Sequence, residues 1–142
     1  MKKIYMILVF TLFACKSGEG TSAIPQGEPL LQYSKGPCLG RCPVYDFMVY
    51  PDGNFTYKNV RAIGPNKEIK GRLATEEMEK LTSALKSELG TPSAFKRVRD
   101  LPITKLKFDT KKYEYHASKI SEGLKKVNTL IEDMVAGIVV GQ

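Results

Sequence analysis

Residues 44–60, Val-Tyr-Asp-Phe-Met-Val-Tyr-Pro-Asp-Gly-Asn-Phe-Thr-Tyr-Lys-Asn-Val, decide the fold because they predict a β-hairpin of defined register. Residues 51–53, Pro-Asp-Gly, suit a three-residue connection built on a type I turn, in which Gly53 takes the left-handed conformation of a bulge. This connection sets Asp46 opposite Lys58 on one face of the hairpin. The other face gathers the large apolar side chains, which are Tyr45, Phe47, Val49, Phe55 and Tyr57. A two-residue connection would scatter them over both faces, and we reject it.

The segments around this hairpin predict an α+β fold, with a single antiparallel sheet of about five to six strands and two helices packed on one face. Further strands are expected at 30–34, 68–73, 103–108 and 113–117, and helices at 75–89 and 121–135. Thr75 is the expected N-cap of the first helix. A short turn is expected within 93–99, and the apolar residues 134–140 are expected to form the buried end of the second helix.

The first fifteen residues predict an exported protein. Lys2 and Lys3 precede an apolar run at 4–14, and Cys15 ends it. A basic start, about ten apolar residues and a small residue before the break are typical of a secretory signal and too short for a membrane span. The cysteine at the break resembles the lipobox of bacterial lipoprotein signals, which implies that Cys15 carries a diacylglyceryl group and becomes the new N-terminus.

The sequence therefore divides into three expected parts. Residues 1–15 are the lipoprotein signal peptide, residues 16–28 are a tether rich in Gly, Ser and Pro, and residues 29–142 are a single α+β domain. The expected location is the bacterial cell envelope, periplasmic or surface-facing, with the outer membrane favoured. The first expected partner is the membrane, through the N-terminal lipid.

The basic excess of the chain lies in one stretch. The formal net charge is +7, and +5 remains without Lys2 and Lys3. The same excess of +5 is found between residues 95 and 113, where two aspartates accompany the basic residues Lys96, Arg97, Arg99, Lys105, Lys107, Lys111 and Lys112. The first interpretation of this basic surface is a solvated strand-and-loop surface, and the alternative is a binding surface for an anionic envelope component or a protein partner. No nucleic acid is expected as a partner, since an exported protein rarely meets it.

Cys38 and Cys42 form the one motif with candidate chemistry, and three interpretations stay open. A disulfide is expected in an oxidising compartment once Cys15 carries lipid. A reactive dithiol is the second interpretation, although the strand pattern that follows lacks the helix N-terminus that would stabilise a thiolate. The third is a copper site of Cys38, Cys42 and the single histidine, His116, because thiolates and imidazole suit that metal. The C-x-x-x-C-P spacing resembles the site of copper-delivery proteins in respiratory oxidase assembly.

Outside that alternative, we expect no cofactor and no catalytic residue. The sequence holds no Gly-rich phosphate loop, serine elbow or His-Glu metal helix. His116 alternates away from Tyr113 and Tyr115 along its strand, which predicts a surface position for the imidazole. These observations favour a binding or accessory module over an enzyme.

Residues 36–45, Gly-Pro-Cys-Leu-Gly-Arg-Cys-Pro-Val-Tyr, resemble the G-P-C-x-G-x-C-P-x-Y signature of an uncharacterised bacterial family, a domain of unknown function. Its members look like exported or lipid-anchored proteins with an aromatic strand and an x-D-G turn, as at 51–53 here. The likeness covers most of residues 29–135. It implies the fold and the compartment, and it brings no established activity.

Overall fold

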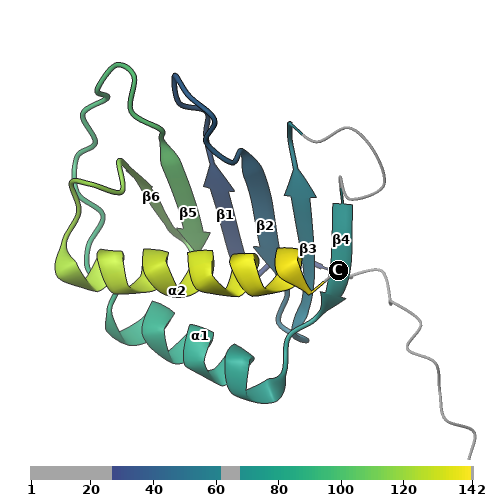
Figure 1. Ribbon diagram of the computed structural model, residues 1–142. Coiled ribbons are helices and arrows are strands. Elements are labelled where there is room, and N and C mark those ends of the chain that lie inside the picture. The colour runs from purple at the N-terminus through teal and green to yellow at the C-terminus, as the bar shows by residue number, and fades with distance from the viewer. Residues whose placement is uncertain (1–26, 62–67, 142) are drawn as a thin grey trace, which may run out of the picture.

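The computed structural model describes residues 27–61 and 68–141. Within them, strands and helices follow in the order strands, helix, strands, helix (Figure 1). The elements are β1 (Leu31–Lys35), β2 (Tyr45–Val49), β3 (Asn54–Asn59), β4 (Glu68–Arg72), α1 (Thr75–Ser87), β5 (Thr104–Phe108), β6 (Lys111–Tyr115) and α2 (Glu122–Val140). The predicted signal peptide, its Cys15 and nearly all of the predicted tether lie outside the described residues.

The strands form one six-stranded antiparallel sheet in the order β4-β3-β2-β1-β5-β6, which confirms the predicted α+β class. The β2–β3 hairpin has the predicted register, since Val49 pairs with Phe55 and Phe47 pairs with Tyr57. Gly53 has a φ of 84°, the left-handed conformation that the turn requires. β1 joins this hairpin to the β5–β6 hairpin because it pairs with β2 along one edge and with β5 along the other.

Both helices pack on the same side of the sheet (Figure 1). Alternate strand residues point toward the helices and are buried, as the period of two along a strand requires. The side chains with at most 1% exposure in this core are Leu31, Tyr33, Phe47, Val49, Leu81, Leu85, Leu106, Val127 and Ile131. The intervening strand residues form the opposite surface, here called the uncovered face. Its members include Gln32, Ser34, Asp46, Met48, Thr56, Lys58, Lys70, Lys105, Lys107, Lys112 and Glu114.

The start of α1 differs from the expectation. Thr75 is the first helical residue and not the N-cap, because Ala74 holds the capping position. The backbone N–H of Ala74 donates to Glu77 Oε2 over 2.9 Å. The Glu77 carboxylate therefore supplies the polar contact at this helix start, and an alanine is tolerated at the N-cap.

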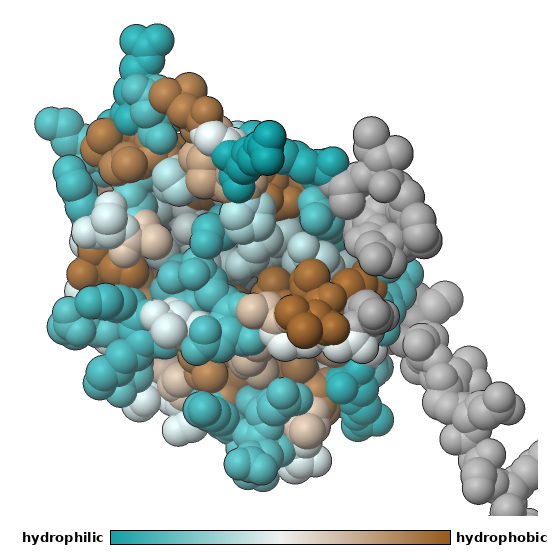
Figure 2. Space-filling view, viewed as in Figure 1, coloured by the Kyte–Doolittle hydropathy of each residue, from teal (hydrophilic) through white to brown (hydrophobic). Residues whose placement is uncertain are grey.

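The end of α2 also differs from the expectation. The helix continues beyond Val135 to Val140, and the N–H of Gly141 still donates to the carbonyl of Gly137 over 3.0 Å. Val135 is buried, whereas Val140 is 85% exposed, so the apolar tail is not the buried end that the sequence predicted. Figure 2 shows hydrophobic atoms at the surface at this end of α2. Neither described helix is both long and apolar enough to cross a bilayer.

Residues 90–103, here called the strap, connect α1 to β5 and pass outside β6 (Figure 1). The turn expected within 93–99 does not form as such, since the strap lacks regular structure until a turn at Arg99 and Asp100. The Tyr113 hydroxyl donates to the carbonyl of Gly90 over 2.7 Å and fixes the beginning of the strap. Ser93 and Phe95 then border a cavity on the uncovered face.

Candidate functional site

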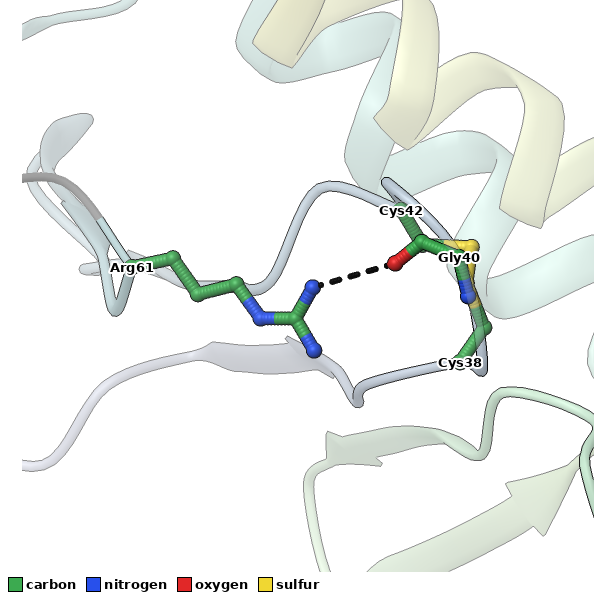
Figure 3. The surroundings of a disulfide bond; sticks show 4 residues. All are labelled: Cys38, Gly40, Cys42 and Arg61. Carbon is green, nitrogen blue, oxygen red and sulfur yellow. Dashed lines mark hydrogen bonds between the residues drawn. A yellow bond between two sulfur atoms is a disulfide. The ribbon is translucent and has the colours of Figure 1, made fainter.

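A disulfide closes the loop between β1 and β2. It joins Cys38 to Cys42, whose Cα atoms lie 5.8 Å apart. The N–H of Gly40 donates to Cys38 Sγ over 3.2 Å, and Arg61 Nη1 donates to the carbonyl of Gly40 over 3.3 Å (Figure 3). The element that follows Cys42 is β2, so no helix N-terminus adjoins this pair. The arrangement is that of a structural link.

The disulfide loop contacts the end of the strap. The N–H of Gly36 donates to the carbonyl of Ile103 over 2.8 Å, and a Cβ at Gly36 would lie only 2.8 Å from that same oxygen. Glycine is therefore required for this close approach. A cavity of about 560 Å³ separates the two segments and is lined by residues 37–39 and 97–101 together with Ile103. Leu39 stands at its rim with 82% of its surface exposed.

The prediction of a surface position for His116 is wrong, because this side chain is only 4% exposed. The backbone N–H of Val98 donates to His116 Nε2 over 2.9 Å, and Nδ1 lies 2.9 Å from the carbonyl oxygen of Pro102. Since Nε2 accepts, Nδ1 carries the proton and donates to Pro102. The ring also packs against Phe95, with a centroid distance of 5.0 Å. His116 therefore holds the strap against the end of β6.

The structure does not group the residues of the copper alternative. Cys38 and Cys42 are bonded to each other, and both ring nitrogens of His116 contact the strap backbone. Among residues 27–61 and 68–141, no three His, Cys, Asp or Glu side chains are arranged to hold a metal ion. The described residues therefore do not form the copper site that was considered for Cys38, Cys42 and His116.

The structure divides the predicted basic surface into separate groups. Lys105 and Lys107 of β5 and Lys112 of β6 line one cavity on the uncovered face. Arg97 and Arg99 line the cavity beside the disulfide loop. The other two residues lie elsewhere: Lys96 borders a cavity along the β6 edge, and Lys111 begins β6. Only the three lysines on the uncovered face come from paired strands and share one cavity.

The charges in this group are not balanced. Lys105 Nζ lies 3.9 Å from Glu114 Oε1, which makes one weak ion pair. Lys107 and Lys112 are directly opposite each other in the β5–β6 register. Neither makes an ion pair or hydrogen bond with a described residue. Like charges directly opposite on paired strands repel each other. An anion between Lys107 and Lys112 would relieve this repulsion.

A buried polar cluster lies under α2, and the sequence did not predict it. The hydroxyls of Tyr33 and Tyr115 both donate to Asn128 Oδ1, over 2.8 and 3.0 Å. Tyr33 also approaches Glu132 Oε1 at 3.2 Å, and Lys35 Nζ pairs with that oxygen at 2.6 Å. The available sequence signal was Asn128 itself, a polar residue beside the apolar stripe of the second helix.

Burial governs the acidity of this cluster. Burial, with added repulsion from neighbouring tyrosinates and from Glu132, raises the pKa of Tyr33 far above its ordinary range. Burial likewise raises the pKa of Tyr45 and of Tyr115. The phenols therefore stay protonated and act as hydrogen-bond donors, which suits a structural contact between sheet and helix.

Together, these features define an α+β domain with a disulfide-closed loop and a lysine-lined cavity on an uncovered sheet face. The chain belongs to the family described as a domain of unknown function (DUF6438), whose model matches residues 29–135. The match confirms a family of unknown function over these residues, whereas the signature motif and the lipoprotein character stay predictions. A comparison with curated proteins gave no match.

Proposed function

We propose that this protein is a lipid-anchored, non-enzymatic binding module of the bacterial cell envelope. Cys15 would hold it at the membrane, and the uncovered sheet face would meet an anionic partner. The basic and apolar leader before Cys15 supports the anchor. The Cys38–Cys42 disulfide supports an oxidising compartment, because such bonds are rare in the reducing cytosol.

One observation carries the binding role: three lysines of adjacent strands line one cavity on the uncovered face. Of these three, only Lys105 has a carboxylate within 4.0 Å among the described residues. A surface that was merely solvated would gain nothing from placing Lys107 opposite Lys112, since this pairing destabilises the sheet. An anionic partner would remove that cost by neutralising both charges.

The anchor is tested by expressing the full chain in a bacterial host fed radiolabelled palmitate. The wild-type chain should incorporate label and sediment with membranes. Cys15→Ala should incorporate none and appear in the soluble fraction, whereas the nearby Ser17→Ala should behave as the wild type. Unchanged labelling of Cys15→Ala, or an unprocessed protein in the cytosol, would overturn the anchor.

The anionic partner is tested with dextran sulfate, using the full chain with Cys15→Ala so that no acyl group contributes. Neutralising the cavity lysines should weaken binding about tenfold. The triple variant is Lys105→Gln, Lys107→Gln and Lys112→Gln. The matched control removes the same charge from exposed positions outside the uncovered face and is Lys80→Gln, Lys119→Gln and Lys125→Gln. An equal loss in both triple variants would show that only the net charge matters, and the proposed face would be rejected.

A further inference from the structure

The cavity on the uncovered face has the form of a small-molecule site. Its volume is about 430 Å³, within the range of ligand pockets. Its floor comes from β1, β5 and β6, which contribute Gln32, Lys107 and Lys112. Ser93 and Phe95 of the strap form a wall beside this floor. Segments far apart in the sequence thus meet around one concave space.

The charge of the cavity is concentrated on one side. Along one line across the three strands, Gln32 pairs with Lys107 and Lys107 pairs with Lys112. Along the next line, Lys105 is partly compensated by Glu114 at 3.9 Å. Lys107 and Lys112 therefore lie on the Gln32 side with no ion-pair or hydrogen-bond partner among the described residues. Lys107 is half-buried. A ligand at this point would need about two negative charges to balance them.

We propose that this cavity binds a phosphate monoester, with the phosphate between Lys107 and Lys112. A phosphate monoester carries nearly two negative charges at neutral pH, which matches the two lysines. Lysine ammonium groups bind phosphate as point charges. Gln32 adds an amide donor and Ser93 a hydroxyl donor at the cavity wall.

Phe95 gives the site its second element of selectivity. Its ring borders the cavity and is held in place by contact with His116, at a centroid distance of 5.0 Å. An aromatic or apolar substituent on the phosphate would pack against this ring and exclude water from the charged contacts. The ligand class is therefore a phosphate monoester that carries an apolar group. This inference rests on the proposed binding function and names the ligand chemistry of the same face.

The experiment follows amide signals of the full chain by NMR, with Cys15→Ala present throughout, during titration with phenyl phosphate. Shifts should centre on Gln32, Ser93, Lys107 and Lys112. Phenyl sulfate, which has a similar shape and a single charge, should bind about tenfold more weakly. Lys107→Gln with Lys112→Gln should weaken phenyl phosphate binding at least about tenfold. The control pair, Lys58→Gln with Lys70→Gln on the same face, should remain within about twofold.

A second arm identifies the source of the phosphate. Vesicles of phosphatidylcholine with phosphatidic acid present the monoester as a lipid headgroup, and phenyl phosphate presents it free in solution. Binding of both through Lys107 and Lys112 supports the proposal, and preference for one of them assigns the source.

Three outcomes would overturn the inference: shifts spread over the whole basic surface, equal affinity for the sulfate and the phosphate, or equal losses in both lysine pairs. Dextran sulfate binding that depends on the cavity lysines, without a phenyl phosphate site, would reject this inference and leave the proposed function standing. A phenyl phosphate site in a protein that is never lipidated would reject the envelope role instead.

Discussion

At the scale of single residues, His116 connects β6 to the strap that borders the candidate site. Its two ring nitrogens bind the backbone of Val98 and Pro102, and its ring supports Phe95. All three partners belong to the strap that borders the lysine cavity. The His116 imidazole therefore positions the strap, which forms one wall of the lysine cavity.

Replacing this imidazole should loosen the strap. In His116→Ala, the partly buried N–H of Val98 and carbonyl of Pro102 lose their partners, and the free energy of unfolding should fall by about 2 kcal/mol. Urea denaturation measures this change. The exposed Lys119→Ala, in the same loop, should change stability by less than about 0.5 kcal/mol. If the two variants were equally stable, His116 would have no such positioning role.

The disulfide should contribute a comparable amount. In the chain-entropy model, closing so short a loop stabilises the folded state by about 2 kcal/mol. A reductant should therefore lower the urea midpoint of the wild-type chain and leave that of the double variant Cys38→Ser and Cys42→Ser unchanged. A wild-type midpoint that does not respond to reductant would argue against this contribution.

The contrast between Gly53 and His116 shows what local sequence can predict. The left-handed conformation of Gly53 follows from the chemistry of three adjacent residues, and the structure confirms it. The alternation argument failed at His116 because β6 ends at Tyr115 and the chain then turns, with the N–H of Lys119 donating to the carbonyl of His116. The partners of His116 are also 14 and 18 residues away, and no local pattern specifies them.

At the scale of the elements, the two helices come into close contact where α1 ends and α2 begins. A Cβ at Gly123 would overlap the carbonyl oxygen of Glu88, so the absence of a side chain there permits the contact. Lys126 adds an ion pair to Glu88 at 3.3 Å. Near the other end of α2, Gly137 has open space around its Cβ position.

These two glycines should respond oppositely to alanine. Gly123→Ala should lower the free energy of unfolding by about 2 kcal/mol, because the clash between backbone and side chain outweighs the higher helix propensity of alanine. Gly137→Ala should raise it by up to about 1 kcal/mol, since only propensity changes there. Thermal and urea unfolding of both variants measures whether each substitution raises or lowers the free energy of unfolding. Stabilisation by both substitutions would show that the helix contact tolerates a methyl group.

The sequence predicted which segments form helices and strands, but it predicted the first and last residues of these elements less well. Both helices were expected from their apolar spacing, yet the apolar end of α2 was expected to be buried, and Val139 and Val140 are exposed. At the start of α1, the hydroxyl of Thr75 was the obvious capping group, but the Glu77 carboxylate provides the contact one residue earlier. A helix end depends on competing contacts that cost similar free energies, and sequence alone does not rank them.

At the scale of the whole molecule, the tyrosine cluster joins the sheet to α2. Tyr33 lies on β1 and Tyr115 on β6, and both donate to Asn128 of α2. Within the described residues, no buried side-chain nitrogen or oxygen atom lacks a partner. The cluster therefore specifies how the two layers fit together, in addition to the apolar contacts around it.

Alkaline pH should unfold the protein through these phenols. The pKa values of Tyr33, Tyr45 and Tyr115 are raised in the folded state, mainly by burial, whereas the unfolded chain releases these protons near pH 10. The folded state then binds more protons, so the free energy of unfolding is intact below about pH 10 and falls above it. These three groups give a slope of about 4 kcal/mol per pH unit, and Tyr57 and Tyr113, whose pKa values burial also raises, add to it.

Urea denaturation across this pH range measures the slope. Tyr33→Phe should reduce it by about 1.4 kcal/mol per pH unit, because one ionising group with a raised pKa is removed. A stability that stays constant from neutral pH to about pH 11 would contradict the assigned burial effect.

The sheet order shows the limit of sequence reasoning at this scale. Each hairpin was predictable because its strands are joined by a short turn. The contact between β1 and β5 brings Leu31 beside Phe108, and no turn or periodic pattern encodes a pairing over such a distance. The lysine cavity depends on that same contact, so its residues were predicted as a basic stretch but not as one concave site.

The central place of β1 has a mechanical consequence. Residues that precede Leu31 enter the sheet in its middle, where β1 is bonded to β2 on one side and to β5 on the other. A force applied through the N-terminal segment therefore pulls along β1 and must shear two ladders at once. A segment attached to an edge strand would instead peel away one rung after another. The domain is built to withstand tension at the end by which a membrane anchor would hold it.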